Sequence, residues 1–172
     1  SPGAPPRCAR TEVVVVAGRF EGKRALVTGA SGGVGRSTVE LLEEEGARVV
    51  GLDLAESEGV LACDVSDEAS VRAAVAEAVR RLEGLDVVVN VAGIDRFRRF
   101  EDLDVATWQQ HLGVNLTGPM LVTHAALPHL RESRGNVVTI ASIAGLRAQP
   151  YQAAYCASKA GVVMLMKSLA LE

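Results

Sequence analysis

Short apolar runs alternate with longer amphipathic runs along most of this chain, from Arg24 onward. The short runs are rich in valine and continuously apolar, which is typical of strands buried on both faces of a parallel sheet. The longer runs repeat apolar positions at helical spacing. The predicted strands are residues 25–28, 48–53, 60–63, 86–89 and 136–140, and the predicted helices are residues 34–45, 68–82, 105–130 (where breaks are expected) and 152–171.

This order of strand and helix predicts an α/β fold. Alternation of this kind requires crossover connections, so the sheet is expected to be Rossmann-type, parallel and doubly wound, with helices on both faces. Residues 1–18 carry three prolines and are predicted to form a poorly ordered extension. Residues 19–172 are expected to form one domain.

Composition limits the partners that such a domain takes. The 172 residues are 48% hydrophobic and 23% charged, with a formal net charge of −3. Because the signs are mixed along the chain, no basic stripe could follow a row of phosphates, and no nucleic-acid partner is expected. The longest apolar stretches are too short to span a bilayer, so no membrane partner is expected either. A small-molecule substrate fits best. The acidic run at residues 43–45, at a predicted helix C-terminus, is expected to be an exposed face.

The cysteines and histidines suggest no special chemistry. The cysteines are few, widely spaced and form no C-x-x-C pair, which favours a reducing, cytoplasmic location. The histidines have no carboxylate or cysteine partner at ligand spacing, so no metal is expected. These residues are Cys8, Cys63, Cys156, His111, His124 and His129.

A glycine-rich segment joins the first predicted strand to the first predicted helix. Glycine permits a positive φ and lets the backbone approach a pyrophosphate, while the free N–H groups of the following helix attract its charge. The segment therefore predicts a dinucleotide-binding loop. The residues expected to bind the cofactor there are Gly29, Ser31, Gly33, Val34 and Gly35.

The second predicted strand ends on Asp53, near the spacing expected for a ribose partner. A carboxylate here can accept both ribose hydroxyls and repels a 2′-phosphate. The next residue is Leu54 rather than a basic residue, which also favours NAD over NADP. Arg36 weakens the inference slightly, since a guanidinium beside the loop could meet a phosphate; a solvated position in the first helical turn is its alternative role.

Tyr155 and Lys159 stand four residues apart, which puts a phenol and an ammonium on one face of the last predicted helix. A phenol is a poor base at neutral pH, but a neighbouring cation stabilises its phenolate. The pair is therefore a candidate for proton transfer, although the spacing alone also fits an ordinary surface pair.

With this pair, the sequence resembles the short-chain dehydrogenase/reductase family over residues 20–172, with the motifs in the family's order. One departure is Val91, where the family commonly has a second asparagine. Beyond the glycine loop, Asp53, Tyr155 and Lys159, the resemblance rests on Cys63, Asp64, Val65, Asn90, Ala92, Gly93, Asn115 and Ser142.

The resemblance implies an enzyme that interconverts a secondary alcohol and a carbonyl compound by hydride transfer with NAD. Tyr155 is then the general acid for reduction and the general base for oxidation. Lys159 stabilises its phenolate and binds the nicotinamide ribose, Ser142 orients the substrate oxygen, and Asn115 holds a water of the proton relay. Asp64 and Val65 are assigned to the adenine end, and Asn90, Ala92 and Gly93 to the cofactor wall.

Two other functions remain open. The loop also fits G-x-x-G-x-x-G through Gly29, Gly32 and Gly35, a spacing typical of longer relatives that act as epimerases or dehydratases. The short interval between Ser142 and Tyr155 instead resembles the short form of the family. A non-catalytic NAD-binding module, such as a redox sensor, is the second alternative, against which the complete set of proton-relay residues argues.

The last predicted helix is apolar almost all round over residues 160–166, more than one sheet face needs. A partner subunit would explain this, and the resemblance implies a homodimer or homotetramer. The family continues beyond this helix with further strands. We therefore expect that the C-terminal strands are missing, that the fifth strand is an open edge, and that residues 1–172 alone are an inactive fragment.

Overall fold

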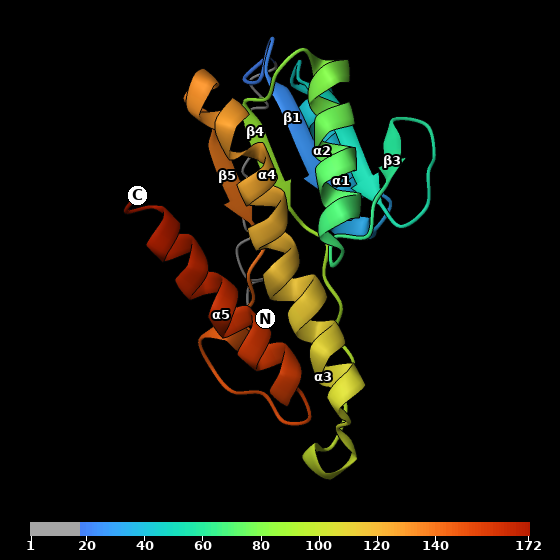
Figure 1. Cartoon of the computed structure of the whole chain (residues 1–172), viewed down its shortest axis with the longest axis vertical. Helices are drawn as coiled ribbons and strands as arrows, with labels where there is room; N and C mark the ends of the chain where they lie inside the picture. Colours follow the sequence, from blue (N-terminus) through green and yellow to red (C-terminus); the bar gives the residue numbers. More distant parts are fainter. Residues whose placement is uncertain (1–17) are drawn as a thin grey trace, which may run out of the picture.

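The computed structural model describes residues 18–172, so Cys8 and nearly all of the predicted N-terminal extension lie outside the described residues. The described part follows the predicted alternation of strand and helix (Figure 1). The strands are β1 (Arg24–Thr28), β2 (Arg48–Asp53), β3 (Val60–Ala62), β4 (Val87–Asn90) and β5 (Asn136–Thr139). The helices are α1 (Gly33–Glu44), α2 (Glu68–Leu82), α3 (Val105–Leu112), α4 (Gly118–Ser133) and α5 (Ala153–Leu169).

The strands form one parallel sheet with the order β3-β2-β1-β4-β5. The chain winds outward from β1 to β3, returns to place β4 on the other side of β1, and ends the sheet at β5. In register, Leu26 of β1 pairs with Val50 on one side and Val88 on the other. This is the predicted doubly wound Rossmann-type sheet, with β5 at one edge.

Successive residues of β1 face opposite sides of the sheet, and both sides are buried. Leu26 belongs to the larger core, which α2 and α4 cover, whereas Ala25 and Val27 belong to a smaller core with Leu42 of α1. Figure 1 shows α2 and α4 crossing one face of the sheet, with α5 beside α4 beyond β5. The continuous apolar character of the central strands follows from this burial on both faces.

The predicted middle helix is interrupted, as its sequence indicated. Between α3 and α4 lies a π-helical turn, Gly113–Thr117, in which the N–H of Gly118 donates to the carbonyl of Gly113. Such a turn holds one more residue than an α-helical turn and commonly occurs at functional sites. Here it carries Asn115, which is buried.

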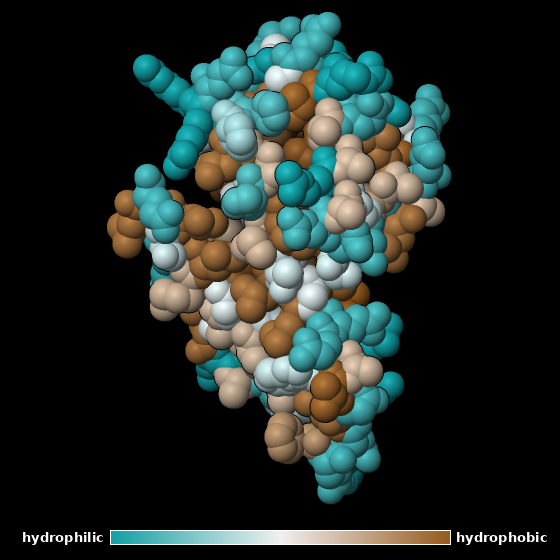
Figure 2. Space-filling view, viewed as in Figure 1, coloured by the Kyte–Doolittle hydropathy of each residue, from teal (hydrophilic) through white to brown (hydrophobic). Residues whose placement is uncertain are grey.

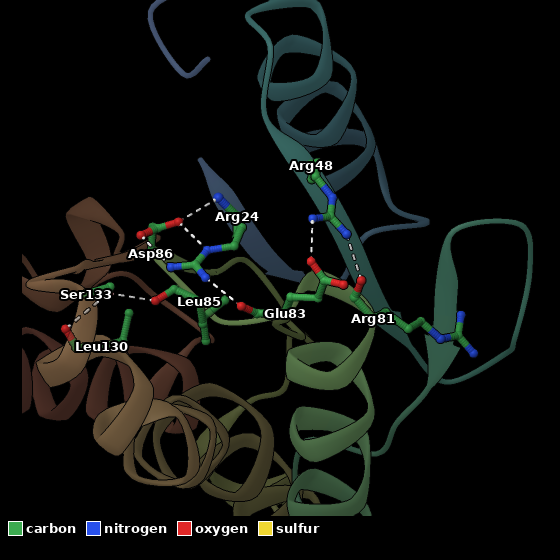
Figure 3. A network of polar contacts seen from close by, with 8 residues as sticks. All are labelled: Arg24, Arg48, Arg81, Glu83, Leu85, Asp86, Leu130 and Ser133. Atoms are coloured by element: carbon green, nitrogen blue, oxygen red, sulfur yellow. Dashed lines mark hydrogen bonds and ion pairs between the residues drawn. The ribbon is translucent and has the colours of Figure 1, made fainter. Parts of the chain in front are cut away.

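A polar network joins the amino-terminal ends of β1 and β4 (Figure 3). The Asp86 carboxylate accepts from the backbone N–H of Arg24 at 2.9 Å and from Arg24 Nε and Nη2 at 2.7 and 3.1 Å. Arg24 Nη1 donates to the carbonyl of Glu83 at 2.6 Å. The Ser133 hydroxyl at the end of α4 donates to the carbonyl of Leu85 at 2.7 Å. These contacts tie β1, β4 and α4 together at one end of the sheet.

The expectation that the acidic run at the end of α1 is merely an exposed face is wrong for Glu45, which is fully buried. Its carboxylate accepts from the side chain of Arg19 at 2.7 Å and from the backbone N–H of Arg19 at 3.1 Å. These hydrogen bonds hold the pKa of Glu45 below its usual value. Arg19, in the segment before β1, is therefore the cation that compensates the unfavourable position of an acidic residue at a helix C-terminus.

Apolar side chains gather on the surface formed by α4 and α5 (Figure 2). Met120 and Met164 are among the exposed large hydrophobic residues there. Within the described residues, no helix is both long and apolar enough to cross a membrane.

Candidate active site

The glycine-rich loop after β1 needs glycine at two positions for steric reasons. Gly29 has a φ of +66°, and a Cβ there would lie 2.9 Å from the backbone of Ala92. A Cβ on Gly35 would lie 2.0 Å from the carbonyl oxygen of Gly29. The start of α1 therefore packs directly on the loop, and the loop on the segment that follows β4.

The N-terminus of α1 is open toward the loop. Gly32 is the N-cap and provides no side-chain hydrogen bond to the first turn. The first N–H groups of a helix have no partner inside the helix, so those of Gly33, Val34 and Gly35 can bind an anion. The guanidinium of Arg36 instead donates to the carbonyl of Ser31 at 3.2 Å.

A cavity of about 770 Å³ lies beside this loop, at the carboxyl ends of the strands. In doubly wound sheets, ligands bind at this edge where the strand order reverses, here between β1 and β4. The cavity brings together most of the predicted site residues. From that set its lining contains Gly29, Ser31, Gly33, Val34, Gly35, Asp53, Leu54, Asp64, Val65, Ala92, Gly93, Tyr155 and Lys159.

Asp53, the last residue of β2, holds the glycine loop from the side. Its Oδ2 accepts from the N–H of Ser31 at 2.9 Å, and its Oδ1 accepts from the N–H of Leu54 at 2.7 Å. Both hydrogen bonds fix the carboxylate at the wall of the cavity. Its remaining lone pairs are available to hydroxyl donors.

The end of β3 closes the same part of the cavity. Val65 is buried, while Asp64 accepts from the N–H and the hydroxyl of Ser66 at 2.9 and 2.7 Å. Cys63 also lines the cavity, and burial raises the pKa of its thiol. A thiol held protonated in this way packs rather than reacts.

Asn90 lies outside the cavity lining, unlike Ala92 and Gly93 of the same motif. It is buried, and its Nδ2 donates to the hydroxyls of Thr123 and Thr139 at 3.3 and 3.2 Å. The side chain therefore links β4 to α4 and β5 instead of forming the cofactor wall.

Thr28, the last residue of β1, has a role that sequence reasoning did not assign. Its hydroxyl oxygen accepts from the N–H groups of Val91 and Ala92 at 3.0 and 3.1 Å. It therefore fixes the chain where it leaves β4. A hydroxyl residue at the end of a buried strand, just before the loop, was the available signal.

Asn115 in the π-helical turn uses its whole side chain to hold neighbouring segments. Oδ1 accepts from the N–H of Ile94 at 2.8 Å, and Nδ2 donates to the carbonyl of Ile94 and to the hydroxyl of Ser158 at 2.9 and 3.0 Å. The amide therefore connects the segment after β4 to α5.

Lys159 is buried on α5, and its ammonium donates to the carbonyl of Ile140 at 2.8 Å. The Nζ atom lies 5.8 Å from the centroid of the half-buried Tyr155 ring. Burial lowers the pKa of Lys159 below the ordinary lysine value. The two groups of the predicted pair are therefore neighbours at the wall of one cavity.

Ser142 follows β5 by a short connection but is not part of the cavity lining, where Ile140 and Ala141 are found instead. Its hydroxyl oxygen accepts from the N–H of Ala144 at 3.1 Å and begins the 3-10 turn Ile143–Gly145. That turn packs tightly on α5, because a Cβ on Gly145 would lie 2.6 Å from the carbonyl oxygen of Lys159. Among the described residues, no group of three or more His, Cys, Asp or Glu could hold a metal ion.

Comparisons with known proteins agree with this geometry. A family model described as short chain dehydrogenase matches residues 23–172. The chain is 39% identical to L-fucose dehydrogenase from Bos taurus and 38% identical to D-threitol dehydrogenase from Mycolicibacterium smegmatis, and each match covers 90% of this chain. It spans 62% and 65% of those two proteins. The crystal structure of a short chain dehydrogenase from Mycobacterium smegmatis superposes with a TM-score of 0.85 at 35% identity, covering 90% of this chain and 72% of the other.

Proposed function

The chain belongs to the short-chain dehydrogenase/reductase family, and from that premise we propose that the protein is an NAD-dependent oxidoreductase that interconverts a secondary alcohol and a ketone. The supporting observation is that one cavity joins the glycine loop, the Asp53 carboxylate and the Tyr155/Lys159 pair. The first two suit a dinucleotide, and the last suits proton transfer.

The residues that line the cavity have the chemistry that a dinucleotide cofactor requires. The N–H groups at the start of α1 would hold its pyrophosphate, and the absence of side chains at Gly29 and Gly35 lets the loop pack closely enough to present them. Asp53 would accept the hydroxyls of the adenosine ribose, with Asp64 and Val65 beside the adenine. When bound, the nicotinamide group supplies or accepts the hydride.

The choice of NAD over NADP rests on Asp53. An uncompensated like-charge contact between its carboxylate and a 2′-phosphate at ~4 Å costs on the order of 4 kcal/mol at an intermediate dielectric. The nearby cation, Arg36, already donates to the carbonyl of Ser31 and does not line the cavity. Leu54 supplies no charge that could compensate.

Tyr155 would move the proton. Its phenol would donate a proton to the carbonyl oxygen during reduction, and its phenolate would accept a proton from the alcohol during oxidation. The Lys159 ammonium, held by the carbonyl of Ile140, stabilises the phenolate form.

Ser142 would orient the substrate oxygen, a role for which its hydroxyl must turn from the N–H of Ala144 toward the cavity. Asn115 would position a water through its backbone, because its side-chain amide is bound to Ile94 and Ser158.

Tyr155→Phe tests this assignment directly. The variant keeps the ring but removes the transferable proton, so turnover should fall by ~10² to 10⁴-fold while NADH affinity stays the same. The names of two relatives refer to L-fucose and D-threitol, so sugars and polyols join ketones in the first substrate panel. Tyr151→Phe, which alters an exposed phenol in the turn before α5, is the matched control. A Tyr155→Phe variant with the turnover of the wild type would refute the assignment.

The same panel separates the two alternatives. An NAD-binding sensor would bind NADH and turn over no substrate. An epimerase or dehydratase with transient hydride transfer would convert substrate without net NADH formation, which chromatography of the products detects. Net NADH formation from a secondary alcohol supports the proposed dehydrogenase.

A homo-oligomer built through α4 and α5 is part of the proposal. The support is the apolar surface over these helices, including Met120 and Met164 (Figure 2). Met164→Glu should shift the mass measured by sedimentation toward the monomer, and a wild type that sediments as a monomer contradicts this part.

A further inference from the structure

Residues 94–98 form one wall of the candidate cofactor cavity, and we call them the wall segment. They follow β4, belong to no helix or strand, and include Ile94, Asp95 and Arg96 of the cavity lining. A segment without regular structure has no ladder of backbone hydrogen bonds to hold it. Its position therefore depends on partners supplied by other elements.

Those partners come from two sides. From the π-helical turn, the Asn115 amide binds both the N–H and the carbonyl of Ile94. From the turn before α5, the carbonyl of Tyr151 accepts from the N–H of Arg98 at 2.9 Å. The two contacts hold the ends of the wall segment, and the N–H of Arg96 lies between them.

His111 binds that central N–H. It lies on α3, one helical turn before Asn115, and its side chain is fully buried. Its Nε2 lies 3.1 Å from the backbone nitrogen of Arg96, and its Nδ1 lies 2.8 Å from the carbonyl oxygen of Thr107. A carbonyl can only accept and an amide can only donate, so Nδ1 carries the proton and Nε2 is the acceptor.

We propose that His111 is a positioning residue, whose neutral imidazole fixes the backbone of Arg96 and so holds the wall segment against the cofactor. This inference rests on the proposed function, because it takes the cavity to be the cofactor site. His111 itself is absent from the cavity lining, so it acts through the wall segment. An apolar residue in its place would leave a backbone N–H without a partner, and the segment would have to move to reach water.

The hydrogen bond itself can be observed in the wild-type protein. With ¹⁵N labelling, a nitrogen–nitrogen scalar coupling should connect the Arg96 amide with His111 Nε2, and the Nε2 shift should be that of an unprotonated nitrogen. The Arg96 amide should also exchange slowly with solvent. A folded protein without the coupling, or with a protonated Nε2, overturns the proposal, even when no variant can be purified.

Two variants then test the consequence for the site. His111→Phe keeps a ring but removes both nitrogens, so exchange at the Arg96 amide should accelerate about tenfold and NADH should bind roughly three- to tenfold more weakly. His111→Gln restores an acceptor and a donor and should recover most of the affinity. Leu41→Phe, at an exposed position on α1, is the control and should match the wild type.

An unchanged NADH affinity in a folded His111→Phe protein overturns the proposal, as does a His111→Gln protein that is as impaired as His111→Phe. A wrong proposed function would give a different result, because the wild-type protein itself would then not bind NADH. The scalar coupling and the exchange of the Arg96 amide are measured without cofactor and do not depend on that outcome.

Discussion

Charged side chains are paired differently at the two ends of the parallel sheet. At the amino-terminal end, Arg24 and Asp86 bind each other through three hydrogen bonds (Figure 3). At the carboxyl end, the buried ammonium of Lys159 has only a backbone carbonyl as its hydrogen-bond partner within residues 18–172. None of the ion pairs among the described residues involves Lys159.

We expect this difference to separate groups that stabilise the fold from groups that act in the proposed site. A charge that is matched within the protein lowers the free energy of the folded state. A buried charge without a counter-ion raises it, and such a residue persists where its charge has a function. We therefore expect substitutions at the two ends to affect stability and binding in opposite proportions.

Gly35→Ala should reduce both stability and NADH binding, because Gly35 lies at the carboxyl end of the sheet and its backbone packs against that of Gly29. The new Cβ would lie 2.0 Å from the carbonyl oxygen of Gly29, and backbone cannot move aside cheaply. We expect a loss of about 3 kcal/mol in the free energy of unfolding and weaker NADH binding. Urea unfolding and NADH titration measure the two effects.

Gly33→Ala is the matched control, since a Cβ there meets nothing within 4 Å. It should keep the stability of the wild type to within about 0.5 kcal/mol. Equal stability of the two variants would show that the loop is not packed as described.

Asp86→Ala should lower stability alone, because it removes the acceptor of three Arg24 hydrogen bonds far from the cavity. The two side chains are 28% and 14% exposed, so the cost is below that of a fully buried pair, about 2 kcal/mol. NADH affinity should not change. A variant that loses NADH binding while it retains stability would contradict the division between the two ends.

The pH dependence gives an independent check on Asp86. Its pKa is lowered, mainly by the hydrogen bonds from Arg24. The folded state therefore favours the carboxylate, and the stabilisation is present above the unfolded-state pKa of about 4 and is lost as the pH falls through the folded-state pKa. The stability difference between the wild type and Asp86→Ala should shrink over that acidic range.

Lys159→Met should change the free energy of unfolding less than Gly35→Ala and Asp86→Ala do, and it should raise that free energy rather than lower it. Burial lowers the pKa of Lys159, so the folded state disfavours the charge, and removal of the ammonium should stabilise the protein by about 1 kcal/mol at neutral pH. Wild-type stability should rise with pH up to the usual lysine pKa of about 10.4, and that of the variant should not.

Lys167→Met, at an exposed position of the same helix, is the control for Lys159→Met and should be neutral. Destabilisation by Lys159→Met of more than about 1 kcal/mol would mean that the ammonium supports the fold rather than the site.

The fold could be predicted from the sequence because local patterns determine it. β2 and α2 have the predicted bounds, since strands buried on both faces and an amphipathic helix with an Asp67 N-cap leave clear signals. Part of the cavity lining could be found from the glycine loop and from the carboxyl ends of strands, whereas Ile94, Asp95 and Arg96 of that lining were not predicted.

Contacts between segments distant in the sequence could not be predicted. Glu45 resembled an exposed residue until Arg19 was seen to pair with it, and His111 had no visible partner because it binds a backbone N–H fifteen residues away. Asn90 belongs to a cofactor motif, yet its side chain faces Thr123 and Thr139. A motif gives the residue type, and only the packing gives the direction of the side chain.

The proposed NAD site at the carboxyl end of the sheet owes its selectivity to Asp53. Titration of the protein with NADH and with NADPH, followed by cofactor fluorescence at one fixed ionic strength, measures that selectivity. We predict saturable NADH binding at least about tenfold tighter than NADPH binding. A tenfold ratio corresponds to ~1.4 kcal/mol, which is well within the repulsion between one carboxylate and a phosphate. Asp53→Asn should reduce that ratio. Equal affinity for the two cofactors, or saturable binding of neither, would contradict an NAD site selected by Asp53.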